Sequence, residues 1–198
     1  MTKEEFNEKW ENYWYHYKWH TLIALFVAFC IIFTVTDHLT RKANDFEITY
    51  IGDYMDYEGL AGAVTEKYGD IIGDINGDGV VKTEVNNIYT AKNIAHDSDI
   101  NLWQRVDMDI INGQSYIYLV DEHLLSAFMG RGANGVIKTK DGYEPYIEIT
   151  DNEFFKPYLP KDKKVYLLVR QKFQGKIDES IEKIEDASTL LLEKILEK

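Results

Sequence analysis

The sequence predicts an α/β protein, in which an N-terminal amphipathic and transmembrane helix is followed by a three-layer, mostly parallel α/β domain. One long apolar segment lies near the N-terminus, and strand-like and helix-like patterns alternate from about residue 46 onward. The 198 residues, of which 45% are hydrophobic, suit a globular chain and exclude disordered and low-complexity classes.

The apolar segment is long enough to cross a bilayer. No Asp, Glu, Lys or Arg occurs from Trp19 to Thr36, and residues 22–33 read LIALFVAFCIIF. A helix of this length reaches about 27 Å, close to the roughly 30 Å of a hydrocarbon core. The segment before the span is too long and too acidic for the n-region of a usual cleaved signal peptide. We therefore predict a transmembrane signal anchor over residues 19–38, with a buried core helix as the alternative.

The residues before this span are rich in Trp and Tyr, which favour the membrane interface. Phe6, Trp10, Tyr13, Trp14 and Tyr17 recur at helical spacing. We therefore expect residues 1–18 to be a juxtamembrane segment that forms an amphipathic helix on the membrane surface. The alternative is that the same face packs against a helix of an integral membrane partner.

Basic residues near the span predict its orientation. Lys3, Lys9 and Lys18 precede it, and Arg41 and Lys42 follow it. Because basic residues favour the cytoplasmic side, this excess predicts a cytoplasmic N-terminus and a single-pass protein of the cell membrane.

The remaining chain is expected to be a linker at residues 39–45 and an extracytoplasmic α/β domain at residues 46–198. Residues 1–42 contain five acidic and five basic side chains, so the net charge of −12 falls entirely on residues 43–198. Such acidity argues against nucleic-acid binding, which needs a basic surface. The single cysteine, Cys30, lies in the span, so the domain has no disulfide.

The elements of the domain follow from the spacing of apolar residues. Alternating or continuous apolar runs predict strands at residues 46–52, 81–89, 116–120 and 165–169. Helices are predicted through Leu60, Val64 and Tyr68, through Ile100, Trp103, Val106 and Ile110, over residues 122–128, and through Ile177, Ile181, Ile184, Leu191 and Ile195. Residues 130–163 are expected to be loops with short strands.

A calcium-binding loop is suggested by the sequence GDINGDGVV at residues 73–81. Asp74, Asn76 and Asp78 alternate as oxygen ligands would, Gly79 permits a sharp turn, and the carbonyl of Val80 follows. This pattern resembles the DxNxDG half-loop of EF-hands and dockerins.

The second half of the loop departs from the EF-hand pattern. Lys82 and Val85 stand where an EF-hand has its later ligands, so the last ligand would come from Asp70, Glu84 or a distant acid. The predicted metal residues are Asp74, Asn76, Asp78, Val80 and Glu84. With few carboxylates the affinity for Ca²⁺ would be weak, about 10⁻⁴ to 10⁻³ M, and its role structural. The alternative is a bare Asp/Asn/Gly turn.

No catalytic or organic cofactor-binding residue is predicted. Gly130–Gly135 matches GxGxxG but follows a helix rather than a strand, so we interpret it as a turn. His16 and His20 lack the acidic partner of an HExxH site. His123 follows a core strand, where α/β sheets bind ligands, or is an ordinary residue of a first helical turn.

Two resemblances bear on function. The element order over residues 46–128, with NGQSYIYLVDE at residues 112–122, is similar to one lobe of bacterial extracellular solute-binding proteins. The whole chain, with WENYWYHYKWH at residues 10–20 before the anchor, resembles uncharacterised bacterial single-pass membrane proteins. These resemblances imply a membrane-anchored domain that binds a small-molecule or peptide ligand.

Three functions therefore stay open. The first is a non-enzymatic extracytoplasmic binding or interaction domain, anchored in the lipid bilayer and stabilised by a calcium loop. The second is an accessory subunit of a transport or envelope complex, docked through its N-terminal and transmembrane helices. The third, an envelope enzyme, predicts that acidic residues gather with His123 in one cleft.

Overall fold

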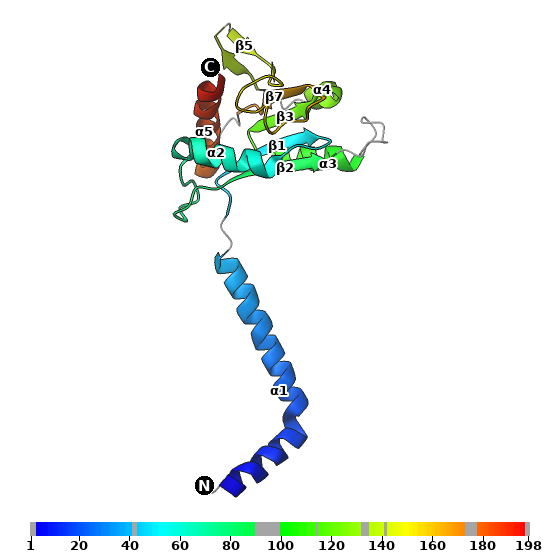
Figure 1. Ribbon diagram of the computed structural model, residues 1–198, viewed down its shortest axis with the longest axis vertical. Helices are drawn as coiled ribbons and strands as arrows, with labels where there is room; N and C mark the ends of the chain where they lie inside the picture. Colours follow the sequence, from blue (N-terminus) through cyan, green and yellow to red (C-terminus); the bar gives the residue numbers. More distant parts are fainter. Residues whose placement is uncertain are drawn as a thin grey trace. The chain divides into compact units, whose positions relative to one another are not determined.

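The computed structural model describes residues 3–40, 43–89, 100–113, 115–131, 135–140, 142–172 and 178–196 (Figure 1). The chain forms two compact units, Met1–Lys42 and Ala43–Lys198. Some sequence-based predictions fall outside the described residues: those on Arg41, Lys42 and Ile177, on part of the glycine-rich segment 130–135, and on the side chains of Lys3, Phe6 and Lys9.

The first unit is a single helix, α1 (Lys3–Thr40), which continues through the predicted surface helix and the predicted span. Figure 1 shows that α1 bends in its N-terminal half. The hydroxyls of Tyr13 and Thr21 share a hydrogen bond of 2.7 Å, although residues eight apart lie about 12 Å apart along a straight helix. This bond therefore joins two side chains that are more than two helical turns apart in the N-terminal half of α1.

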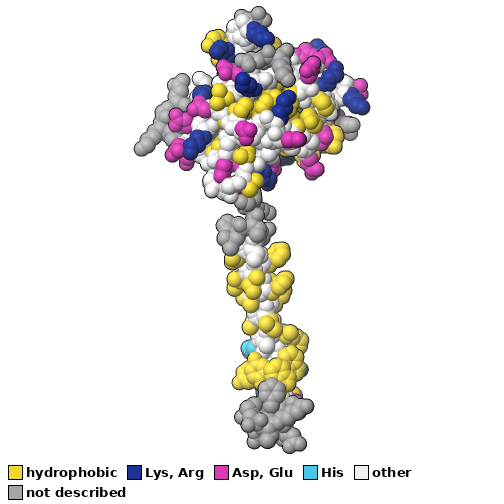
Figure 2. Space-filling view, turned by 60° about the vertical axis from the view of Figure 1, so that its left-hand side comes forward, with side chains coloured by type: hydrophobic (Ala, Val, Ile, Leu, Met, Phe, Trp, Pro, Cys, Tyr) yellow, Lys and Arg dark blue, Asp and Glu magenta, His cyan; other side chains and the backbone are white. Residues whose placement is uncertain are grey.

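Part of α1 is long and apolar enough to span a membrane. Among the described residues this holds for one helical segment, Trp10–Thr36, and none of its most apolar stretch is buried. Phe26, Ile32 and Phe33 are each more than 60% exposed, and apolar side chains cover the visible face of the segment (Figure 2). A helix buried in this chain's own core is therefore excluded, whereas a membrane anchor and a signal sequence both agree with this exposure.

The second unit confirms the predicted α/β class. Its described elements are β1 (Phe46–Gly52), α2 (Tyr57–Ile72), β2 (Thr83–Tyr89), α3 (Ile100–Asn112), β3 (Ile117–Asp121), α4 (Glu122–Met129), β4 (Ile137–Thr139), β5 (Gly142–Glu144), β6 (Ile147–Glu148), β7 (Val165–Val169) and α5 (Glu179–Leu196).

The main sheet has the strand order β2-β1-β3-β7-β6 and is mixed. Strand β1 pairs in parallel with β2 and β3, whereas β7 pairs antiparallel with β3 and β6. The prediction of a mostly parallel sheet is therefore wrong for the β7–β6 half. Parallel neighbours need a crossover, which α2 and α3 supply. Residues 149–164, which join β6 to β7, form turns rather than a helix, and these two strands run in opposite directions. Strands β4 and β5 form a separate antiparallel pair.

Helices pack on both faces of the sheet and enclose two hydrophobic cores. In the α2–α5 core, Val64 of α2 and Leu191 of α5 join Leu119 of β3. The α3–α4 core combines Val106 of α3 with Phe128 of α4 and with the opposite face of β3. Because side chains alternate along a strand, β3 supplies both cores.

The buried face of α3 is shifted relative to the predicted apolar stripe. Ile100 is 69% exposed, whereas Leu102 and Asp109 are buried together with the predicted Trp103 and Val106. The shift accommodates a polar layer under α3, which apolar periodicity does not reveal.

In this layer the Thr49 hydroxyl lies 3.3 Å from Asp109 Oδ2 and 2.8 Å from the Ser115 hydroxyl. Glu47 lies two residues before Thr49, on the same face of β1. Burial, followed by the charges of Asp109 and Glu84, raises the pKa of Glu47 to about 7. The carboxyl group of Glu47 is therefore partly protonated near neutral pH.

We predict that Glu47 makes the fold less stable as the pH rises from about 4.5 to 7, since the folded chain then holds a proton that the unfolded chain has lost. Glu47→Gln should remove this loss and raise the free energy of unfolding at pH 7.5 by about 1 kcal/mol, after allowance for the partial exposure of Glu47. Urea unfolding at pH 4 and pH 7.5 measures the effect. Glu144→Gln, on the exposed strand β5, is the control, and equal pH profiles for the two variants would contradict the prediction.

Candidate functional site

The candidate site lies at the carboxyl ends of the adjacent parallel strands β1 and β3. The helix after β1, α2, packs in one core, and the helix after β3, α4, packs in the core on the opposite face. The chain therefore leaves the two strands toward opposite faces of the sheet. Such a topological switch point is where α/β proteins commonly bind ligands.

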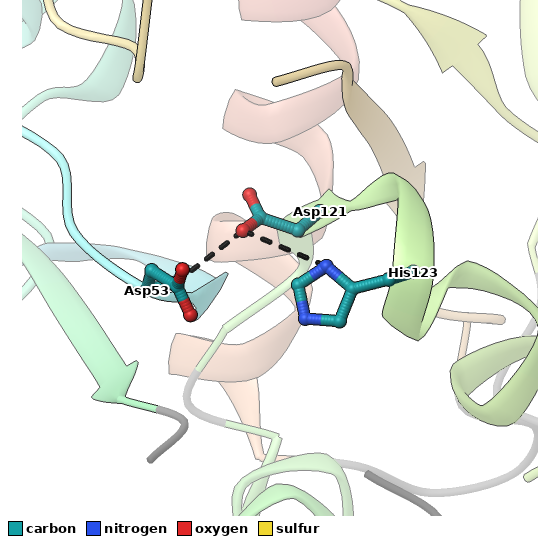
Figure 3. A group of neighbouring side chains, drawn as sticks. All are labelled: Asp53, Asp121 and His123. Carbon is teal, nitrogen blue, oxygen red and sulfur yellow. Dashed lines mark hydrogen bonds and ion pairs between the residues drawn. The ribbon is translucent and has the colours of Figure 1, made fainter. Parts of the chain in front are cut away.

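A buried carboxylate occupies this position. Asp121, the last residue of β3, is fully buried, and its Oδ1 accepts a hydrogen bond of 2.7 Å from the hydroxyl of Tyr50. Its Oδ2 accepts a 3.3 Å bond from the backbone N–H of Asp53, just after β1 (Figure 3). Burial and the charge of Asp121 raise the pKa of Tyr50 far above its usual range, so that Tyr50 stays a hydrogen-bond donor.

Gly52 makes this contact between β1 and β3 sterically possible. A Cβ atom at residue 52 would lie 2.3 Å from the hydroxyl oxygen of Tyr50 and 2.7 Å from Cγ of Asp121. A side chain at this position would therefore displace the hydrogen bond that joins the two strands.

A lysine and a histidine complete the cluster. The Lys163 ammonium pairs with the carboxylate of Asp53 and lies 3.6 Å from Oδ2 of Asp121. Burial alone would lower the pKa of Lys163, but the hydrogen bond to Asp53 and the charge of Asp121 outweigh it and raise that pKa. Lys163 is therefore a cation shared by two carboxylates. His123 Nδ1 lies 4.0 Å from Asp121 Oδ2, too far for a hydrogen bond.

The same side chains are candidate metal ligands. One ligand atom from each of Asp53, Asp121 and His123 lies within 4.8 Å of the others, which is the one such group found among the described residues. Carboxylates with an imidazole suit a transition metal such as zinc. The ammonium of Lys163 contacts both carboxylates, however, so a metal ion would have to displace it. The geometry therefore favours an ion-pair network over a metal centre.

A cavity of about 400 Å³ opens beside the cluster, within the size range of small-molecule sites. Its lining side chains are Glu122, His123, Thr150, Lys161, Asp162, Lys163 and Lys164. Three of these residues are lysines, but Lys163 also contacts Asp53 and Asp121, and Lys164 lies 3.4 Å from Glu148. A ligand with a carboxylate or phosphate group would share these lysines with the protein's own carboxylates. Glu122 and Asp162 thus lie with His123 in one cavity, as the enzyme hypothesis predicts. Asp121, however, is not hydrogen-bonded to His123.

The chain matches no protein-family model, no curated protein and no solved structure.

The predicted calcium loop lies between α2 and β2. The carboxylate of Asp74 accepts hydrogen bonds from the backbone N–H groups of Gly77, Asp78 and Gly79, at 2.7, 3.1 and 2.7 Å. The side chain of Asn76 accepts one from Asp78, and that of Asp78 accepts one from Val80, both at 2.9 Å. Gly77 and Gly79 have φ values of 76° and 82°, a conformation that favours glycine. The loop is thus closed by its own side chains.

Asp45 supports this loop from outside and was not predicted from the sequence. It is buried, and its Oδ1 accepts hydrogen bonds from the N–H groups of Ile75 and Asn76 at 2.9 and 3.0 Å. Its Oδ2 accepts one from Lys82 N–H at 2.9 Å, so one carboxylate joins both ends of the loop. An acidic residue directly before a buried strand was the available signal in the sequence.

Glu84, the last predicted calcium ligand, lies on β2, where its carboxylate accepts a hydrogen bond from the side chain of Asn44. Val80 is 46% exposed. Calcium binding by Asp74, Asn76, Asp78, Val80 and Glu84 stays a prediction.

We predict that Asp121→Asn destabilises the fold by about 1–3 kcal/mol, because the amide keeps the bond from Tyr50 but removes a charge beside Lys163. Urea unfolding measures the change. Asp162→Asn, an exposed residue of the same cavity, should change stability by less than about 0.5 kcal/mol. Equal effects of the two substitutions would show that the network does not stabilise the carboxyl ends of the strands.

Proposed function

We propose that this chain is a membrane-anchored, non-enzymatic extracytoplasmic domain that binds a ligand at the carboxyl ends of β1 and β3. The observation that carries the proposal is the combination of an exposed apolar helix with a separate α/β unit that has a cavity at its topological switch point. The proposal includes a similarity to one lobe of solute-binding proteins, which the order of strands and helices along the chain supports.

The length and the aromatic residues of α1 support membrane anchoring. Its 38 residues reach about 57 Å, well beyond a hydrocarbon core of about 30 Å, so a large part of α1 lies outside that core. Trp10 stacks on Trp14 and Tyr13 on Tyr17, with ring centroids 6.2 and 5.4 Å apart. Such amphipathic rings suit the headgroup region. We therefore assign this N-terminal part to the membrane surface, on the cytoplasmic side.

The cavity at the switch point supports a binding role. Lys161, Lys163 and Lys164 lie on its wall, and Lys163 is held in place by Asp53 and Asp121. A preorganised cation beside an open cavity suits a small molecule or peptide that carries a carboxylate. His123 and Asp121 lie 4.0 Å apart, without the hydrogen bond of a catalytic pair, which favours a binding role over substrate turnover.

A second candidate is an accessory subunit that docks onto an integral membrane partner through α1. The exposed rings of Trp10, Tyr13, Trp14 and Tyr17, which contact one another, favour it, since such a surface packs well against another helix.

The calcium loop is proposed as a structural element of the domain. Its ligands Asp74 and Asp78 are two carboxylates held in one loop, and an ion between them would relieve their repulsion. With a dissociation constant of about 10⁻³ M, the site would be filled at the calcium concentration outside the cytoplasm.

We predict that the full-length protein stays in the membrane fraction at alkaline pH and that protease added to intact cells digests residues 43–198. Deletion of residues 1–18 should leave the chain in the membrane fraction, since residues 19–38 suffice to span. A protected domain would refute the orientation, and release of the full-length chain would refute the anchor. Loss of a co-purifying membrane protein only in the deletion variant would favour the accessory subunit.

We also predict that Ca²⁺ raises the melting temperature of the protein relative to a chelator. At a tenfold excess over the dissociation constant, mass action gives about 1.4 kcal/mol. Asp78→Asn is the matched control, because the amide oxygen still accepts the bond from Val80 while a ligand charge is lost. The absence of a shift, or an equal shift in Asp78→Asn, would refute calcium binding at this loop.

A further inference from the structure

A second cavity, of about 800 Å³, lies between α2, the turn at residues 151–158 and Ile195 of α5. It does not share a lining residue with the cavity at the carboxyl ends of β1 and β3. The two cavities are therefore separate sites.

Aromatic rings form one wall of this cavity. The rings of Tyr68 and Phe154 meet edge to face, with centroids 5.1 Å apart and an interplanar angle of 74°. Phe154 also contacts Tyr158, at 6.5 Å, and the buried Phe155, at 5.2 Å. These contacts fix the orientation of the Phe154 ring, so the wall presents preformed ring faces.

A cation already lies over these faces. Nζ of Lys67 is 5.3 Å from the ring centroid of Tyr68 and 5.0 Å from that of Phe154. Both distances are within the roughly 6 Å range of a cation–π interaction. Lys67 is an exposed residue of α2 with a flexible side chain, so it can move away from the rings. The wall is thus built to hold a positive charge that can be exchanged.

The charge of the cavity also favours a cation. Its lining includes three acidic residues, Glu66, Asp151 and Glu153, against the single lysine Lys67. Lys156 pairs with Asp151 at 2.8 Å. Even with that pair, the acidic residues outnumber the basic ones around the aromatic wall, so the local field attracts cations and repels phosphate groups.

We propose that this cavity binds an organic ammonium cation, which stacks on Phe154 and Tyr68 in place of Lys67. The ring faces supply the cation–π attraction, and Glu66 and Glu153 supply the complementary charge. Lys67 is an internal competitor that occupies the rings when the ligand is absent. The acidic wall favours a free ammonium solute over the phosphate-bearing headgroup of a choline lipid.

Calorimetric titration of the full-length protein with choline, in a maltoside detergent that carries no ammonium group, tests this proposal. A quaternary ammonium donates no hydrogen bond, so its binding reports the ring faces. Lys67→Met should bind choline about 5-fold or more tightly than the wild type, and Phe154→Leu about 5- to 30-fold more weakly. Lys183→Met is the matched control, because Lys183 is an exposed residue that pairs with Glu179, does not line this cavity and should leave the affinity nearly unchanged.

Two further ligands identify the chemistry. The uncharged isostere 3,3-dimethyl-1-butanol should bind more weakly than choline, and phosphocholine should also bind more weakly because of the acidic wall. Equal binding of the isostere would overturn the proposal, as would a lack of choline binding by Lys67→Met. Stronger binding of phosphocholine would point to a lipid headgroup and overturn the assignment to a free solute.

Discussion

The desolvated charge of Asp121 is the constraint on which the candidate site depends. A buried carboxylate without partners costs several kcal/mol, so the chain must bring donors to it. These donors come from β1, through Tyr50, from the turn after β1, through Asp53, and from the segment before β7, through Lys163. Since β7 runs antiparallel to β3, its first residue, Val165, pairs with Asp121 itself. One charge thus holds three strands together beside the cavity.

The amino end of β1 is held by a second buried carboxylate, that of Asp45. It joins the start of β1 to the loop that precedes β2. The amino ends and the carboxyl ends of the parallel strands therefore have different roles. Ligands of α/β sheets gather at the carboxyl edge, where Asp121 and the cavity lie. The loop with Asp74 and Asp78 lies at the opposite edge. That position agrees with a structural role for any ion it holds.

The parts of the fold that depend on local patterns were predictable from the sequence, and those that depend on distant contacts were not. Strands β1 and β7 were predicted with their observed bounds, because both are dense in apolar residues. The direction of β7 depends on its neighbours, which no local pattern specifies. His123 was recognised from its place after a strand, but Lys163 lies 110 residues from its partner Asp53. Asp109 was missed because a buried acid breaks the apolar stripe.

The position of Cys30 bears on the conditions under which the domain folds. The chain has a single cysteine, which lies on α1, and the α/β unit Ala43–Lys198 contains none. Neither a disulfide nor a free thiol therefore contributes to the stability of that unit. The redox state of the compartment therefore leaves the covalent structure of this unit unchanged, and its maturation needs no thiol oxidoreductase.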